Sequence, residues 1–198
     1  MPRDALLLVD IQNDFCPGGA LAVPEGDRIV PIANWYARLF ERRGLPVFAS
    51  RDWHPAETTH FQAWGGPWPP HCVQGTKGAA FQPRLSLPDE AVVVSKGMDP
   101  EQDAYSAFQA ETAAGTPLGQ ELKARGVQRL FVGGLATDYC VKASVLDALE
   151  QGLQVFVLED AIKGIDLSAG DVHRAVEEME EHGARTATLH TVEMELSE

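Results

Sequence analysis

Apolar residues recur along this chain with two different periods, and the two periods alternate. The run Ala5-Leu6-Leu7-Leu8-Val9 is continuously apolar, as expected for a parallel strand that is covered on both faces of a sheet. Between Ile29 and Phe40, apolar residues recur every three or four positions. This spacing predicts a helix that lies on the sheet and stops at Gly44.

The same alternation continues to the end of the chain. Further strands are predicted at 47–52, 91–95, 130–132, 155–158 and 186–189, and further helices at 117–125, 138–151 and 172–181. Strands that alternate with helices predict an α/β fold of three layers, in which helices flank a mainly parallel six-stranded sheet with right-handed crossovers. A chain of 198 residues without a linker-like segment is expected to form one domain, over 1–198.

One segment, 53–88, fits neither period. It is dense in Gly and Pro and contains Trp53, Trp64 and Trp68. Long loops of this kind are usually functional or disordered, and three tryptophans favour an ordered loop. We therefore expect this loop to form part of a site.

Composition and charge narrow the class of function. The 16 Lys and Arg residues against 29 Asp and Glu give a formal net charge of −13, which repels nucleic-acid phosphates and anionic membrane surfaces. Neither a nucleic acid nor a membrane is an expected partner. No apolar run approaches the ~20 residues that span a bilayer, and the first apolar run is too short for a signal peptide, so we expect a cytoplasmic protein.

The number and spacing of the cysteines argue against disulfide bonds and cysteine-rich metal sites. Cys16, Cys72 and Cys140 are odd in number and have no CxxC spacing. A disulfide framework and a cysteine-rich zinc finger are therefore both disfavoured. Cys16 has no nearby base and is expected to be a packing residue.

Polar residues end several of the predicted strands. Asp10 ends the first strand, Asp52 the second, Lys96 the third, and Cys140 follows the fourth in a Gly-rich turn. In open parallel sheets, ligands bind beyond the carboxyl ends of the strands. We therefore expect these four side chains to meet at one edge.

Asp10, Lys96 and Cys140 together make an acid, a cation and a thiol. Lys96 and a helix N-terminus are expected to lower the pKa of the thiol, while Asp10 accepts its proton and passes it to a leaving amine. Taken singly, each residue has a simpler interpretation as a strand cap, a solvated lysine or a buried small side chain. Their shared position favours nucleophilic catalysis.

A second set of candidate residues surrounds the end of the second strand. Asp52 and His54 are two positions apart and so lie on the same side of an extended chain, and His60 and His71 follow in the loop. A single histidine is more often structural, but oxygen and imidazole donors together suit zinc, iron or manganese. Asp52, His54 and His71 would form a set of two histidines and one carboxylate. Cys72 directly follows His71 and is expected to point elsewhere.

Five short blocks occur in the order typical of one enzyme family. They are Asp10-Ile11-Gln12-Asn13-Asp14-Phe15, Asp52-Trp53-His54, Trp68-Pro69-Pro70-His71-Cys72, Lys96-Gly97, and Gly134-Leu135-Ala136-Thr137-Asp138-Tyr139-Cys140. Through these blocks the sequence resembles the nicotinamidases, which also deamidate pyrazinamide, within the isochorismatase-like cysteine hydrolase superfamily. The resemblance covers nearly the whole chain.

The resemblance implies a role for each candidate residue. Asp10, Lys96 and Cys140 correspond to the catalytic triad, and Asp52, His54 and His71 to metal ligands, with His60 matching a fourth ligand of some members. Phe15, Trp68 and Tyr105 correspond to the walls of the substrate pocket. The backbone N–H groups of Ala136 and Cys140 correspond to the oxyanion hole, beside an implied cis peptide bond at Leu135-Ala136. Tyr139 departs from members that carry His there, which affects the polarity of the pocket.

The implied reaction converts nicotinamide to nicotinate and ammonia through a thioester, as a step in NAD salvage. The implied cofactor is one divalent metal ion, with zinc preferred over iron or manganese, and this metal binds the ring nitrogen of a small aromatic amide. Two alternatives stay open: a related amidohydrolase of another small amide, such as a carbamoyl or ureido compound, and a nonenzymatic metal-binding domain. The Asp52/His54/His71 set argues against the first. Either a monomer or a homo-oligomer is compatible with the sequence.

Overall fold

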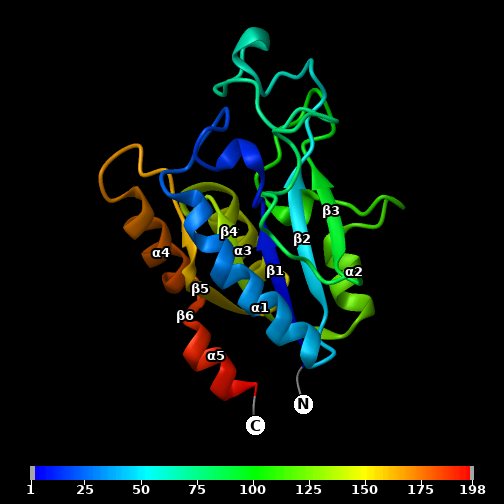
Figure 1. Cartoon of the computed structure of the whole chain (residues 1–198), viewed down its shortest axis with the longest axis vertical. Helices are drawn as coiled ribbons and strands as arrows, with labels where there is room; N and C mark the ends of the chain where they lie inside the picture. The colour runs from blue at the N-terminus through cyan, green and yellow to red at the C-terminus, as the bar shows by residue number, and fades with distance from the viewer. Residues whose placement is uncertain (1–2, 197–198) are drawn as a thin grey trace.

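The computed structural model describes residues 3–196, so the predicted span 1–198 is covered except for two residues at each end, which lie outside the described residues. Its centre is a six-stranded sheet in the order β3-β2-β1-β4-β5-β6, with every neighbouring pair parallel (Figure 1). The strands are β1 (Arg3–Val9), β2 (Val47–Asp52), β3 (Val92–Lys96), β4 (Val127–Leu135), β5 (Gln154–Lys163) and β6 (Arg185–Ala187). The predicted three-layer α/β fold is confirmed.

Helices cover both faces of the sheet (Figure 1). They are α1 (Val30–Arg42), α2 (Leu118–Ala124), α3 (Lys142–Glu150), α4 (Asp171–Glu181) and α5 (Leu189–Glu195). Two separate hydrophobic clusters fill the space between the layers. Residues of α1 and α5 belong to one cluster and residues of α2, α3 and α4 to the other, so the sheet separates two cores.

The first strand explains why its sequence shows no alternation. Leu6 and Leu8 belong to the α1 cluster, whereas Leu7 and Val9 belong to the α3 cluster, and all four are at most 1% exposed. Successive side chains of a strand point to opposite faces, and here both faces are covered. A continuous apolar run is the consequence.

Two predicted elements are corrected at their boundaries. The strand predicted at 186–189 ends at Ala187, and Leu189 instead begins α5, for which the sequence pattern predicts no helix. Thr188 starts this helix with a capping box closed by Thr191, and only Val192 of the helix is buried, which leaves little apolar periodicity to detect. The helix predicted at 138–151 consists of a π-helical turn, Thr137–Val141, followed by α3.

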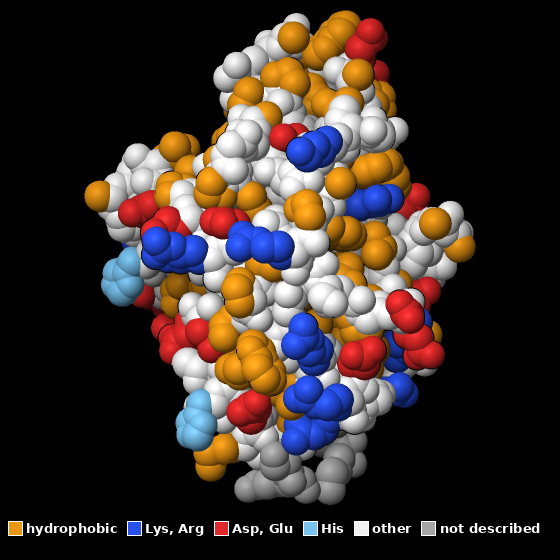
Figure 2. Space-filling view, viewed as in Figure 1, with side chains coloured by type: hydrophobic (Ala, Val, Ile, Leu, Met, Phe, Trp, Pro, Cys, Tyr) orange, Lys and Arg blue, Asp and Glu red, His pale blue; other side chains and the backbone are white. Residues whose placement is uncertain are grey.

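The long loop between β2 and β3 is irregular, as expected, apart from a short 3₁₀ turn at Gln62–Trp64. It projects beyond the carboxyl edge of the sheet (Figure 1), and Figure 2 shows apolar side chains gathered on this projection. Among the helices described between residues 3 and 196, none combines the length and the apolar character that crossing a membrane requires.

One half-buried carboxylate, that of Asp160, joins α1 and α5 to the sheet. The Tyr36 hydroxyl on α1 donates a hydrogen bond to Asp160 Oδ1 at 2.7 Å, and the Leu189 N–H at the start of α5 donates to Asp160 Oδ2 at 2.8 Å. Tyr36 is fully buried. Asp160 therefore fixes two helices of the same face to β5.

We expect Tyr36→Phe to destabilise the protein without affecting any activity of the carboxyl edge. Losing a hydrogen bond to a charged group costs about 1–3 kcal/mol, which for a chain of this size lowers the melting temperature by about 2–4 °C per kcal/mol. Trp35→Phe, at the exposed neighbouring position, is the control and should change stability by less than about 0.5 kcal/mol. Calorimetric melting of both variants tests this; equal melting temperatures for the two would contradict it.

Candidate active site

The structure brings the four predicted strand-end residues together. Lys96, at the end of β3, is 1% exposed, and its Nζ lies 2.9 Å from Asp10 Oδ2 and 3.5 Å from Cys140 Sγ. The same ammonium group also donates a hydrogen bond to Asp52 Oδ1, at the end of β2. The acid, the cation and the thiol predicted from the sequence therefore form one buried cluster.

The charges of this cluster depend on one another. Burial alone would lower the pKa of Lys96, but Asp10 and Asp52 outweigh it and hold that pKa well above its usual value. Burial would likewise raise the pKa of Asp52, yet the charge of Lys96 holds it well below its usual range. Lys96 and Asp52 are therefore charged at neutral pH.

Asp10 differs from Asp52 although both contact the same lysine. Burial is the largest effect on Asp10 and raises its pKa, in spite of Lys96 and of the hydrogen bond that Ser50 Oγ donates to Asp10 Oδ1 at 2.7 Å. A carboxylate with a raised pKa is a better proton acceptor. Asp10 thus has the properties of a general base.

The expectation of a lowered thiol pKa is wrong for this structure. Burial raises the pKa of Cys140 well above its usual value, and Asp10 and Asp52 add to the effect, while Lys96 opposes it. The two carboxylates and the loss of water outweigh one lysine. The thiol is therefore protonated at rest, and its proton has to leave when the sulfur reacts.

Three histidines converge beside this cluster. Nitrogen atoms of His54, His60 and His71 all lie within 4.8 Å of one another. The Nδ1 atoms of His54 and His71 contact the carbonyl oxygens of Gly97 at 3.0 Å and Pro69 at 2.8 Å, and Nδ1 of His60 contacts the Asp103 carboxylate. Because these oxygens only accept hydrogen bonds, each Nδ1 carries the proton and each Nε2 keeps its lone pair.

This donor set fits a divalent metal ion. His54 Nε2 is buried without a hydrogen-bond partner, and Asp52 Oδ2 lies 3.5 Å from it and 3.7 Å from His71 Nε2. Burial also lowers the pKa of His60, although Asp103 opposes this, which favours the neutral ring that a metal requires. Imidazoles whose Nδ1–H groups are held by oxygen acceptors are typical of metal sites. The structure thus gathers all four predicted ligand residues, and a nitrogen of His60 lies within 4.8 Å of nitrogens of both other histidines.

A cavity lies between the thiol and the histidines. It is lined by Phe15, Leu21, Asp52, His60, Trp68, His71, Ala104, Tyr105, Ala136, Tyr139, Cys140 and Ile165. The three predicted wall residues are all present, and Trp68 Nε1 donates a hydrogen bond to the Tyr105 hydroxyl at 2.8 Å. Tyr139 packs edge-to-face on Trp68, with ring centroids 5.2 Å apart. The cavity therefore has the flat aromatic sides that suit an aromatic ring.

The turn before the thiol has unusual backbone geometry. Gly134 has φ 129°, and a Cβ there would lie 2.1 Å from the Val9 carbonyl oxygen, so only glycine fits against β1. The peptide bond Leu135-Ala136 is cis, as the resemblance implies. Ala136 and Cys140 both line the cavity, and the role of their N–H groups as an oxyanion hole stays a prediction.

Sequence reasoning missed several supporting residues. Ser50 could have been found, because it lies two positions before Asp52 and therefore on the same side of β2. Gln12 clamps the Asp52 backbone: its Nε2 donates to the Asp52 carbonyl and its Oε1 accepts from the Asp52 N–H, both at 2.8 Å. Gln12 belongs to the first of the five sequence blocks, but its contact with a residue 40 positions away has no local sequence signal. Asp103 was missed for the same reason.

Comparisons with known proteins agree with this geometry. The model of the isochorismatase domain matches residues 4–191. A nicotinamidase of Escherichia coli K12 is 44% identical, with 96% of each chain covered. The structure is similar to that of the pyrazinamidase of Pyrococcus horikoshii in complex with zinc, with TM-score 0.88, 47% identity and coverage of 95% of this chain and 100% of the other. It is also similar to PnC1 from L. infantum in complex with nicotinate, with TM-score 0.84, 33% identity and coverage of 94% and 92%. By sequence and by structure, this chain belongs to the isochorismatase-domain family.

Proposed function

We propose that this chain is a metal-dependent nicotinamidase, a cysteine amidohydrolase that converts nicotinamide to nicotinate and ammonia and also accepts pyrazinamide. The observation that carries this proposal is one small aromatic cavity that is lined both by Cys140 and by two of the three converging histidines, His60 and His71. A related nicotinamidase at 44% identity supports the same activity. The nicotinate that forms would enter NAD salvage.

The metal centre proposed here is held by Asp52, His54, His60 and His71. Nitrogen and oxygen donors of this kind suit zinc, which also occurs in the Pyrococcus pyrazinamidase structure. When bound, the cation supplies an electron-pair acceptor for the ring nitrogen of the substrate. Phe15 and Trp68 contribute the apolar walls on which the aromatic ring packs.

Catalysis begins with transfer of a proton within the triad. As Cys140 Sγ attacks the carboxamide carbon, its proton moves to Asp10, whose raised pKa makes it a suitable acceptor. The carbonyl oxygen becomes an oxyanion, which accepts hydrogen bonds from the N–H groups of Ala136 and Cys140. Lys96 keeps its proton and stabilises the negative charge of Asp10.

The second half of the reaction reverses these transfers. Asp10 gives the proton to the amide nitrogen, the C–N bond breaks, ammonia leaves and a thioester with Cys140 stays behind. Water then gives a proton to Asp10 and attacks the thioester carbon. When the C–S bond breaks, Asp10 returns the proton to the sulfur, which restores the resting site, and the carboxylic acid that is released ionises to nicotinate.

Cys140→Ala is expected to abolish ammonia release while zinc content and folding stay unchanged, because the sulfur forms the covalent intermediate and does not hold the metal. Cys16→Ala is the matched control. Cys16 is a buried thiol outside the cavity, so this variant should keep nearly full activity. Ammonia release and metal analysis of both proteins test the prediction. Substantial turnover by Cys140→Ala would show that another group is the nucleophile.

The pH dependence of kcat/KM should reflect Asp10. The reactive form has Asp10 deprotonated, so activity is lost as the pH falls through its pKa; since this pKa is raised, the midpoint lies above 3.8. Asp10→Asn should lose about 10² to 10⁴-fold in kcat/KM, together with this acid limb. Ammonia release over a pH series, with circular dichroism to confirm folding, measures both effects. An acid limb that persists in Asp10→Asn would assign it to another group.

Substrate analogues test the proposed contact with the ring nitrogen. Benzamide has the shape of nicotinamide without that nitrogen, so we expect its kcat/KM to be lower by roughly 10² to 10⁴-fold. Pyrazinamide keeps a nitrogen in the required position and should be hydrolysed. A cavity that recognises only an apolar ring would treat benzamide and nicotinamide alike, and comparable kcat/KM values would reject the metal contact.

A further inference from the structure

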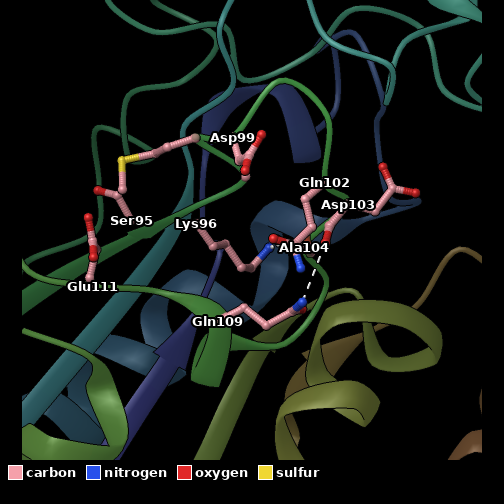
Figure 3. Close-up of a pocket in the computed structure, with 10 residues that line it drawn as sticks. Ser95, Lys96, Asp99, Gln102, Asp103, Ala104, Gln109 and Glu111 are labelled. Carbon is pink, nitrogen blue, oxygen red and sulfur yellow. Dashed lines mark hydrogen bonds between the residues drawn. The ribbon is translucent and has the colours of Figure 1, made fainter. Parts of the chain in front are cut away.

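A three-residue segment between β3 and α2 contacts three parts of the proposed site. The Asp103 carboxylate accepts a hydrogen bond from His60 Nδ1, and the Ala104 carbonyl accepts one from Lys96 Nζ at 3.4 Å. The Tyr105 hydroxyl accepts the hydrogen bond from Trp68 Nε1. Ala104 lines both the catalytic cavity and a neighbouring outer groove, so this segment separates the two. Figure 3 shows the groove, with Ala104 among its lining residues.

We propose that Asp103 is a positioning residue for metal binding, which orients His60 and strengthens electron donation from its Nε2. The inference rests on the proposed function, because it assumes a metal held by Asp52, His54, His60 and His71. Asp103 is then a partner of one proposed ligand, His60, and helps His60 to bind the metal alongside His54 and His71.

The partner of His60 distinguishes it from the other two histidines. His54 and His71 are held by the backbone carbonyls of Gly97 and Pro69, which are neutral acceptors. Among the three, only His60 has a carboxylate as the partner of its Nδ1. A charged acceptor makes a stronger hydrogen bond and polarises the imidazole more than a carbonyl does, which increases the basicity of the ligating nitrogen.

The hydrogen bond between His60 and Asp103 forms without complete desolvation of the carboxylate. The His60 side chain is 4% exposed, whereas that of Asp103, a residue at the outer groove, is 46% exposed. The carboxylate therefore reaches a buried ring while much of it stays hydrated, so the desolvation cost of a fully buried charge does not arise. In Figure 3 the Asp103 side chain points away from the other groove residues that are drawn.

The loop that carries His60 needs such a contact. It has no regular secondary structure at His60, and it is attached to the 99–105 segment through the Pro100 carbonyl, which accepts hydrogen bonds from the Thr58 hydroxyl at 3.1 Å and the Thr59 N–H at 2.8 Å. These bonds fix the backbone next to His60. The hydrogen bond to Asp103 then fixes the rotation of the ring.

Gln109 in turn holds the backbone of Asp103. Its Oε1 accepts hydrogen bonds from the N–H groups of Tyr105 at 2.9 Å and Ser106 at 3.1 Å, and its Nε2 donates to the Asp103 carbonyl at 3.4 Å (Figure 3). One amide side chain thus folds the segment so that Asp103 faces His60 and Tyr105 faces Trp68. Asp103 therefore has a defined backbone position from which to act.

Zinc affinity of the metal-free protein, measured by competition with a chromophoric chelator, tests the inference. We expect Asp103→Ala to weaken zinc binding by about 10 to 100-fold, the usual effect of removing a partner of a metal-bound histidine. Asp103→Asn keeps an oxygen acceptor without the charge and should lie between wild type and Asp103→Ala. Asp99→Asn, which removes a carboxylate from the same groove, is the matched control and should bind zinc like wild type.

A double-mutant cycle separates positioning from a general structural role. If Asp103 acts through His60, adding Asp103→Ala to His60→Ala should change zinc affinity by less than about 2-fold, because coupled residues are not additive. The visible spectrum of the cobalt-substituted protein should change in the same way in Asp103→Ala and His60→Ala. A purely structural tether would lower the melting temperature of the metal-free protein and leave the cobalt spectrum unchanged.

Each outcome has a separate meaning. Equal losses of zinc affinity for Asp103→Ala in the wild-type and His60→Ala backgrounds, or no loss in either, would overturn the inference. If Asp103→Ala does not fold, Asp103→Asn and the Asp99→Asn control decide the question. Failure of the wild-type protein to bind zinc or cobalt would instead reject the proposed metal centre itself.

Discussion

The site depends on one buried ammonium group. Lys96 is almost completely removed from water, and an unpaired charge in that position would cost several kcal/mol. Two carboxylates, Asp10 and Asp52, compensate this cost; Asp52 ends β2, the neighbour of β3, and Asp10 follows β1, the next strand in the sheet. Asp52 also presents its second oxygen to the histidines. The catalytic cluster and the proposed metal centre therefore share one charge network, and Asp52 cannot be changed for one without affecting the other.

The two halves of this network are held by different kinds of structure. The triad stands at the edge of a sheet whose strands are buried on both faces, so its backbone positions follow from the cores. The histidines lie on an irregular loop, which is held by side chains that bind backbone groups: Gln12 at Asp52, and Asp14, whose Oδ2 accepts the Cys72 N–H at 2.7 Å beside His71. Polar residues far apart in the sequence thus replace the secondary structure that the loop lacks.

This difference also explains what the sequence could predict. The continuous apolar run at 5–9 and the strand-end rule were enough to place Asp10 and Lys96 at one edge, because both depend on local pattern and sheet topology. Residue chemistry and spacing pointed to Asp52, His54 and His71, whereas His60 was added as a ligand only by the family resemblance. The contact of His60 with Asp103 joins two irregular segments 43 positions apart, and no periodicity reports it. Helix α5 escaped detection because only Val192 in it is buried, and the thiol pKa depends on a sum of burial and charge that a residue list does not contain.

The protonated state of the resting thiol has a mechanistic consequence. Burial raises the pKa of both Asp10 and Cys140, so each disfavours an additional negative charge in the same dry space. Transfer of the proton from sulfur to Asp10 moves a negative charge from the carboxylate to the sulfur and onward to the carbonyl oxygen, without changing the total charge of the cluster. Lys96 stays within 3.5 Å of the sulfur and 2.9 Å of the carboxylate, and so balances the charge in both positions. A site built in this way needs no stable thiolate, because the thiol loses its proton only as the bond to carbon forms.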